Sequence, residues 1–238
     1  MSSSHTRADT AFPGKSTSLR SGGFAGPDLI LTLGCLALLT SLIIPAVSSS
    51  LEKGRITRCS DNLARINKAI LSLTLDQGGQ LPKASAIPAP GGWWTYKEAL
   101  KPHLTGAPDT LFACPSDRGY SASDEPSVPF HRSAKHNYTS YVYNGVTLPG
   151  IPNVAGRSLE SIKSPAKTLL VMEWSAHGPL SWHRSRTGID DSPFYDGAES
   201  VVGFVDGHVA MTRFHYDGIN AAYTRDPIPG YTYQFSGD

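Results

Sequence analysis

The chain has 238 residues, a formal net charge of +1 at pH 7, 39% hydrophobic residues and 17% charged residues. This balance is typical of a globular protein and excludes the excess of positive charge that marks nucleic-acid-binding proteins, so we expect no nucleic-acid partner. Glycine and proline gather after residue 78, which favours short strands and turns there over a helical bundle. The three cysteines show no CxxC or paired Cys/His spacing, and therefore predict neither a disulfide-dense scaffold nor a zinc site.

Residues 29–47 form an uncharged, mainly apolar run. As a helix this run would be roughly 28 Å long at a rise of about 1.5 Å per residue, close to the roughly 30 Å hydrocarbon core of a bilayer. Two alternatives are a buried helix of a soluble core and a cleavable secretory signal, for which residues 46–48 supply a small-x-small site. The apolar part of such a signal is usually only about 7–15 residues long. We therefore expect a retained single membrane crossing.

The polar leader, residues 1–23, carries three basic residues and one acidic residue: Arg7, Lys15, Arg20 and Asp9. This charge favours a cytoplasmic N-terminus under the positive-inside rule, although three basic residues between 53 and 58 act against it. Asp28 stands directly before the apolar run. A carboxylate toward the membrane centre costs roughly 3 kcal/mol and is rare without a partner or a function. Alternatively, Asp28 lies at headgroup level or is the N-cap of a helix that begins at Leu29.

Together, Gly22-Gly23 before Phe24, then Asp28 and Pro45, resemble the N-terminus of type IV prepilins and type II secretion pseudopilins. The resemblance implies that a prepilin peptidase cuts after Gly23 and that Phe24 becomes the methylated first residue. Asp28 is then the fifth mature residue, where the family usually has Glu, whose carboxylate neutralises the N-terminal amine of a neighbouring subunit. Pro45 is the twenty-second, a place where pilin helices often carry a kinking proline.

Residues 51–76 are expected to continue the helix beyond the membrane. Apolar residues recur there at spacings of three and four, which predicts one buried face: Ile56, Cys59, Leu63, Ile66, Ile70 and Leu73. The opposite face carries charged residues and is either solvated or a partner contact: Arg55, Arg58, Asp61, Arg65 and Lys68. Gly78-Gly79 is expected to end the helix.

Residues 78–238 are expected to form one extramembrane domain. Residues 93–100 predict a short helix, and alternating or β-branched runs predict strands at 139–145, 167–174, 200–205, 208–214 and 231–235. Asp206-Gly207 is a dipeptide preferred in two-residue type I′ hairpin turns, where both central residues need a positive φ. One long helix laid on the resulting antiparallel sheet gives an α+β fold, as in pilins.

Cys114 lies in a turn led by Pro115, in the run LFACPSD. Its candidate disulfide partner is Cys59, because Cys35 lies within the apolar run. An extracytoplasmic compartment permits such a bridge. The alternative is that Cys59 and Cys114 are two free buried thiols.

A narrower resemblance comes from the runs CPSD, SYVYNG, LESIKSPAKTLLVMEW and GFVDGHVAM, which stand in the order seen in prepilin-like proteins of the H-X9-DG (DUF1559-like) type. The motif Asp206-Gly207-His208 is its most specific part. This chain departs from the family at Asp196, which stands where the family has His, with nine residues between it and Asp206. No role of the family histidine is therefore transferred.

Acidic residues gather between His183 and His208. Asp190, Asp191, Asp196 and Asp206 could supply oxygen ligands to Ca²⁺, although the spacing is not that of an EF-hand; the alternative is a solvated loop whose acidic residues form turns. A hydrolase would use His183 or His208 with Asp206. Glu173 is either a catalytic acid or an ordinary carboxylate at a strand end. Neither HExxH, nor GxSxG, nor a glycine-rich phosphate loop occurs.

The sequence thus predicts a structural subunit and not an enzyme, divided into the leader 1–23, the helix 24–77 and the domain 78–238. The resemblance implies a single-pass inner-membrane protein with a cytoplasmic N-terminus and a periplasmic or filament-exposed domain. Its implied partners are a prepilin peptidase, the lipid bilayer, and copies of itself or related subunits in a type II secretion or type IV pilus-like system. No cofactor is expected, calcium apart. The alternative function is a membrane-tethered, non-polymerising module that binds polysaccharide or protein.

Overall fold

The computed structural model describes residues 26–85, 94–104, 106, 109–119, 128–147, 150–178, 180–184, 194–218 and 226–238. The chain divides into two compact units, Met1–Val47 and Ser48–Asp238. The Gly23-Phe24 junction and the acidic residues Asp190 and Asp191 lie outside the described residues.

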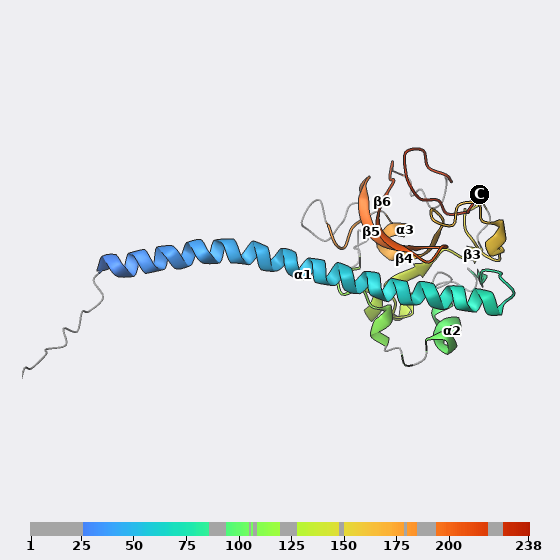
Figure 1. The fold of residues 1–238 in the computed structure, drawn as a ribbon, viewed down its shortest axis with the longest axis horizontal. Helices are drawn as coiled ribbons and strands as arrows, with labels where there is room; N and C mark the ends of the chain where they lie inside the picture. The colour runs from blue at the N-terminus through green and yellow to red at the C-terminus, as the bar shows by residue number, and fades with distance from the viewer. Residues whose placement is uncertain are drawn as a thin grey trace, which may run out of the picture. The chain divides into compact units, whose positions relative to one another are not determined.

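Helix α1, Gly26–Asp76, is the main helix of the chain and contains Pro45. Pro27 lies in its first turn, where a missing backbone N–H breaks no helical hydrogen bond. The helix ends as expected, because Gly78 and Gly79 both have positive φ, and the Gly79 N–H donates to Thr74 O at 2.9 Å. The helix that was predicted for residues 51–76 is therefore confirmed, because these residues form the C-terminal half of α1 (Figure 1).

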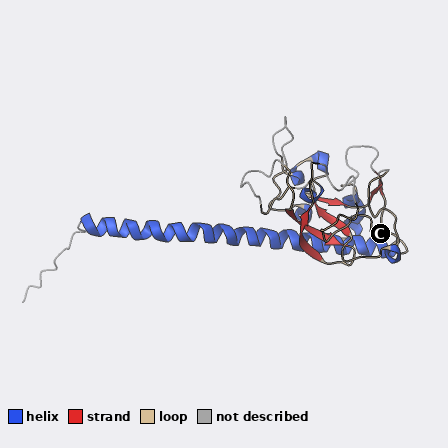
Figure 2. Ribbon diagram, turned by 90° about the horizontal axis from the view of Figure 1, so that it is seen from above, coloured by secondary structure: helices blue, strands red, loops and turns tan. Residues whose placement is uncertain are grey.

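Four strands form an antiparallel sheet in the order β2-β4-β5-β6: β2 is Tyr141–Tyr143, β4 Leu169–Glu173, β5 Ala198–Phe204 and β6 Val209–Phe214. Each lies within or beside a run that predicted it. Inside Ser48–Asp238, the sheet lies against the C-terminal half of α1 in both views (Figures 1 and 2). The fold class is therefore α+β.

The C-terminal half of α1 packs on the sheet through the predicted stripe. Cys59, Leu63, Ile66 and Ile70 are at most 1% exposed, and each such side chain contributes about 1.5–3 kcal/mol when fully buried. The approach is close at Gly203 of β5, where an added Cβ would lie 3.0 Å from the Asn67 side chain. Asn67 Nδ2 also donates to Phe204 O at 2.9 Å, so a polar contact fixes the same crossing.

Short elements surround the sheet. The strands β1 and β3 form a parallel pair, and α2 confirms the predicted short helix; the further elements are α3 and five 3₁₀ turns. Their bounds are β1 Ala84–Ser85, β3 Val146–Thr147, α2 Tyr96–Leu100, α3 Trp174–His177, η1 Lys101–His103, η2 Asp109–Phe112, η3 Phe130–Arg132, η4 Ala134–His136 and η5 Leu159–Ser161.

Two local predictions were wrong. Residues 231–235 form no strand and make a single bridge, Gln234 with Thr168, although Tyr233 and Phe235 are buried as the alternation suggested. The turn at Asp206-Gly207 is not of type I′, because Gly207 has a φ of 97° while Asp206 has no positive φ. Gly207 N–H donates to Phe204 O, and Phe204 N–H donates to His208 O. This is a three-residue hairpin loop in which glycine alone takes the left-handed conformation.

Candidate functional site

The first candidate site is the N-terminal half of α1, whose apolar side chains are exposed. Every residue from Gly26 to Leu51 is exposed, and the large apolar ones are Leu29, Ile30, Leu31, Leu33, Leu36, Leu38, Leu39, Leu42, Ile43, Ile44, Val47 and Leu51. By length and composition, α1 is a helix that could cross a membrane. A soluble monomer rarely exposes an apolar surface of this size, so the surface indicates contact with lipid or another chain.

The polar groups of this half of α1 mostly bond within the helix. Thr32 Oγ1 donates to Asp28 O and Leu29 O, both at 2.9 Å, and Thr40 Oγ1 donates to Ala37 O at 3.0 Å. Such local bonds hide hydroxyl groups from an apolar surrounding. Cys35 is free and exposed.

Asp28 differs from these hydroxyl residues. It lies inside the first turn of α1, which begins at Gly26, and therefore does not cap a helix starting at Leu29. Its carboxylate has no partner among residues 26–238 that the structure describes. A negative charge in the first turn is favoured by the helix dipole.

The second candidate site is buried where α1 meets the loop after η2. Cys59 of α1 and Cys114 of this loop form a disulfide with their Cα atoms 5.1 Å apart, within the usual range. The motif CPSD holds this loop in place. Cys114 N–H donates to Ser140 Oγ at 3.0 Å, and Ser140 Oγ donates to Asp117 Oδ2 at 2.7 Å.

His183 lies beside the disulfide between two carboxylates. Its Nε2 is 2.8 Å from Glu173 Oε1, and its Nδ1 is 2.8 Å from Glu52 Oε1. The side chains of His183 and Glu173 are fully buried, and that of Glu52 is 27% exposed. Val201 N–H donates to Glu173 Oε2 at 2.9 Å, and Ser116 Oγ donates to Glu52 Oε1 at 3.0 Å. Both carboxylates are thus held by groups besides the imidazole.

The electrostatics of this cluster favour a charged imidazole. Burial by itself lowers the pKa of His183, but the charges and hydrogen bonds of Glu173 and Glu52 outweigh it, so the pKa is raised. The pKa of Tyr141 is raised well above its usual value by burial and, secondly, by the charge of Glu173. A buried ion pair of this kind is stable only where its remaining hydrogen-bonding positions are satisfied.

The sulfur atoms belong to the same cluster. Cys114 Sγ lies 3.2 Å from Glu173 Oε1 and 3.8 Å from His183 Nε2, and the four donor atoms of Cys59, Cys114, Glu173 and His183 all lie within 4.8 Å of one another. Sequence spacing did not reveal this group, because its members come from four separate elements. The only sequence signals were the pairing of Cys59 with Cys114 and the isolated candidates Glu173 and His183.

Of the two pairs considered for hydrolysis, His208 and Asp206 come together and His183 and Asp206 do not. His183 pairs with Glu173 and Glu52, whereas His208 Nδ1 lies 2.6 Å from Asp206 Oδ1 in the exposed hairpin loop. The His208 N–H also donates to Asp206 Oδ1 at 3.1 Å. Asp206 thus shapes its own turn and has no contact with His183 among the described residues.

The two described residues among those considered for calcium, Asp196 and Asp206, are separated. Asp196 precedes β5 and Asp206 follows it, so the length of the seven-residue strand, roughly 20 Å at 3.3 Å per residue, lies between them. These two carboxylates cannot bind one ion together. Asp196 Oδ1 instead accepts from Tyr216 N–H at 2.8 Å and Tyr231 O–H at 2.7 Å. It joins the end of the sheet to the C-terminal segment.

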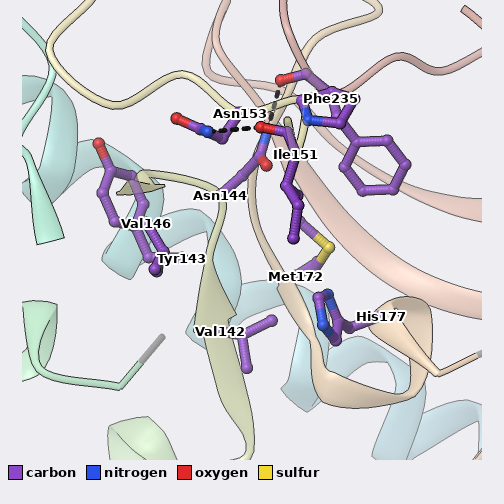
Figure 3. Close-up of a pocket in the computed structure, with 10 residues that line it drawn as sticks. Val142, Tyr143, Asn144, Val146, Ile151, Asn153, Met172, His177 and Phe235 are labelled. Atoms are coloured by element: carbon purple, nitrogen blue, oxygen red, sulfur yellow. Dashed lines mark hydrogen bonds between the residues drawn. The ribbon is translucent and has the colours of Figure 1, made fainter. Parts of the chain in front are cut away.

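A cavity beside β2 is small and serves packing. Its volume, measured as the space that the centre of a water molecule can occupy, is about 20 Å³, which is enough for one water molecule. Figure 3 shows Asn144 bonded across it to Phe235 O, at 2.7 Å, and His177 on the opposite wall. Burial lowers the pKa of His177 to about 4, so this histidine is neutral at pH 7.

Comparison with protein-family models, with curated proteins and with solved structures gave no match for this chain. The functional conclusions below therefore rest on the chain's own residues and geometry. The two sites that enter them are the exposed apolar half of α1 and the buried cluster around His183.

Proposed function

We propose that this chain is a pilin-like or pseudopilin-like subunit, anchored by α1 in a membrane and assembled there with copies of itself or related subunits. The observation that carries the proposal is the division of α1. Its first half exposes mainly apolar side chains, with Asp28 as the only charged residue of 26–50, while its second half packs on an antiparallel sheet. A helix of this kind anchors a folded domain and leaves a free apolar surface for lateral contacts.

Asp28 gives the assembly its proposed specificity. It is the first ionisable residue of the described part of α1, and its carboxylate has no partner among the described residues. Cleavage after Gly23 would create a new amine at Phe24, four residues before Asp28. In apolar surroundings an amine and a carboxylate stabilise one another by pairing, and an amine on a neighbouring subunit would supply that pair.

The proposed cleavage is tested by mass spectrometry of the native protein. The chain is expected to begin at Phe24 and to carry a methylated amine. An intact Met1 would show that no peptidase processes the leader, and a start at Ser49 would show that the apolar segment is a secretory signal. Either result contradicts the proposal.

Lateral assembly is tested with Cys35, the free and exposed cysteine of α1. Mild oxidation of membranes is expected to give a Cys35-dependent dimer, because packed helices bring equivalent positions together. Cys35→Ser is the matched control and must remove the dimer. Asp28→Ala is expected to reduce the dimer severalfold, whereas Asp28→Glu keeps it. A chain that stays monomeric in the membrane would instead be a tethered binding module.

A further inference from the structure

The buried cluster around the disulfide contains more metal-ligating groups than a disulfide needs. Cys59 and Cys114 bring two sulfur atoms, His183 brings Nε2 and Glu173 brings Oε1, and all four residues are buried. A disulfide requires neither the imidazole nor the carboxylate. Two thiolates, one imidazole and one carboxylate are, by contrast, a complete ligand set for a four-coordinate metal ion.

We propose that the dithiol form of this protein binds one Zn²⁺ through Cys59, Cys114, His183 and Glu173. The zinc-bound form and the disulfide form are then alternative cross-links between α1 and the loop that follows η2. The four protein ligands complete the tetrahedron and leave no open position for substrate, so the site is structural.

The distances suit zinc. Zinc bonds of about 2.0–2.3 Å place neighbouring ligand atoms of a tetrahedron about 3.3–3.8 Å apart. Cys114 Sγ already lies 3.2 Å from Glu173 Oε1 and 3.8 Å from His183 Nε2. The two bonded sulfur atoms and the pair of His183 Nε2 and Glu173 Oε1, now 2.8 Å apart, must separate further, and no two of the four ligand atoms are more than 4.8 Å apart. Both pairs are released when the disulfide is reduced and the shared proton leaves.

The surroundings supply the outer contacts that zinc ligands usually have. His183 Nδ1 lies 2.8 Å from Glu52 Oε1, which fixes the ring so that Nε2 faces the sulfur atoms. Val201 N–H holds the second oxygen of Glu173 at 2.9 Å. A carboxylate behind a ligating histidine and a donor behind a ligating carboxylate are typical second contacts of zinc sites. Glu52 is thus a positioning residue.

The change between the two forms balances in atoms and electrons. A newly made chain already carries two thiols; in the oxidised protein a tertiary phosphine gives two electrons to the sulfur pair and becomes its oxide with oxygen from water. The two protons of that water end on Cys59 and Cys114. Zn²⁺ then displaces both thiol protons, and the proton between His183 and Glu173 leaves as these residues bind. Thiolate ligands favour zinc over hard cations such as Mg²⁺ and Ca²⁺.

A surface hollow lies next to Cys114. Among the described residues a hollow of about 360 Å³ is lined by Arg58, Ala113, Cys114, Pro115 and Asp117, among others. Cys114 itself is 0% exposed, so the hollow brings a small phosphine next to the disulfide, and reduction in the folded protein needs a local opening of this wall.

The test uses the full, untagged chain in detergent. It carries Cys35→Ser, so that Cys59 and Cys114 are its only two cysteines. After reduction with a carboxylated phosphine and its removal without oxygen, the protein is titrated with Zn²⁺, and with Co²⁺ as a coloured substitute. The expected result is one metal ion per chain. X-ray absorption should show two sulfur and two nitrogen or oxygen ligands at about 2.3 and 2.0–2.2 Å. The oxidised protein should bind none at this site.

Variants distinguish zinc that is bound by all four residues from zinc that is bound by the two thiols alone. His183→Ala and Glu173→Gln should each remove the four-coordinate spectrum, and Glu52→Gln should weaken binding about 10–100-fold without changing the ligand count. The matched control is His208→Gln, which alters an exposed histidine in the hairpin loop and should bind as tightly as the parent.

Three outcomes would overturn the proposal. One is a reduced chain, still folded by circular dichroism, that takes up no stoichiometric zinc. Another is a bound metal whose absorption spectrum shows sulfur alone. The third is binding that Glu52→Gln leaves unchanged. The ligand set is read from the X-ray absorption spectrum of the Cys35→Ser chain, in which every buried residue is unchanged. The test therefore does not depend on whether His183→Ala folds.

Discussion

The two halves of α1 share a secondary structure and differ in what covers them. Residues 26–50 are exposed and apolar, with Asp28 as their only carboxylate. Residues 51–76 alternate between charged and apolar faces, and their apolar face is covered by the protein's own sheet. A helix needs an apolar partner wherever it is apolar, and the part of the chain that the structure describes covers only the apolar face of residues 51–76.

The difference extends to the polar groups. In residues 26–50 the hydroxyls of Thr32, Thr40 and Ser41 bond to their own helix. In residues 51–76 two asparagine side chains reach across to other elements, Asn67 to Phe204 O and Asn62 to Ala113 O. The first half is therefore ready for an environment without hydrogen-bonding groups, and the second is fixed to one folded domain. The following predictions test this division.

The largest effect is expected from charges in the first half. Leu36→Arg together with Leu39→Arg should reduce membrane integration, because each arginine near the centre of a spanning helix costs about 3 kcal/mol, or about 6 kcal/mol for both. The measurement is the fraction of the full chain that resists alkaline extraction from membranes. Leu75→Arg, at a position 67% exposed in the second half, is the control and should stay integrated. Equal resistance of all three chains would mean that the first half does not span the membrane.

Loss of the disulfide is expected to affect only the second half. Cys59→Ala with Cys114→Ala should lower the free energy of unfolding of the domain by about 4 kcal/mol, because the bridge closes a loop with a sequence separation of 55. Denaturant unfolding in detergent measures it. Cys35→Ala lies in the first half and should leave the midpoint unchanged. A comparable loss with Cys35→Ala would contradict the division.

A smaller effect is expected from one side chain of the buried stripe. Leu63→Ala should lower the free energy of unfolding by about 3 kcal/mol, because Leu63 is fully buried between α1 and the sheet. Leu75→Ala removes the same atoms from an exposed position and should change the stability by less than about 0.5 kcal/mol. Denaturant unfolding of both variants checks this, and equal values would show that the stripe is not the packed face.

What could be predicted from the sequence depended on how local each pattern is. The stripe of α1 was found because a period of 3.6 is written within a few residues, and β4, β5 and β6 were found because their runs are alternating or β-branched. The same reasoning failed for residues 231–235, where alternation reported burial and not pairing: the Phe235 N–H donates to the Asp226 carboxylate at 2.7 Å. An alternating pattern indicates which side chains face the core, but it does not tell which groups the backbone N–H and C=O bond to.

The cluster around His183 could not be predicted in the same way. Glu52 and His183 stand 131 residues apart, and Cys114 and Glu173 stand 59 apart. Their meeting depends on how α1 crosses the sheet, which no local spacing records. Conversely, the acidic residues around Asp196 are close in sequence, but the extended β5 separates Asp196 from Asp206. The sequence therefore suggested a calcium site where none of its described carboxylates meet, and missed a group of ligands that the fold brings together.

The smallest effect is expected from acid, again confined to the folded domain. Burial lowers the pKa of His177 to about 4, from an ordinary value near 6.5. The unfolded chain takes up a proton at this residue first, so stability is lost as pH falls from about 6.5 toward 4. At pH 5 the loss is about 2 kcal/mol, from about 1.5 pH units at 1.36 kcal/mol each.

His177→Gln removes the titrating group and keeps a polar side chain in the small cavity of Figure 3. The variant should lose correspondingly less stability than the parent between pH 7 and pH 5, whatever its stability at pH 7. Leu75→Ala, at an exposed position without a titrating group, is the control and should follow the parent. Denaturant midpoints at each pH measure this. Parallel pH profiles for parent and His177→Gln would contradict this, because they would show that the pKa of His177 is the same in the folded and the unfolded chain. Residues 26–50 contain no histidine, so their membrane integration should not change over this range.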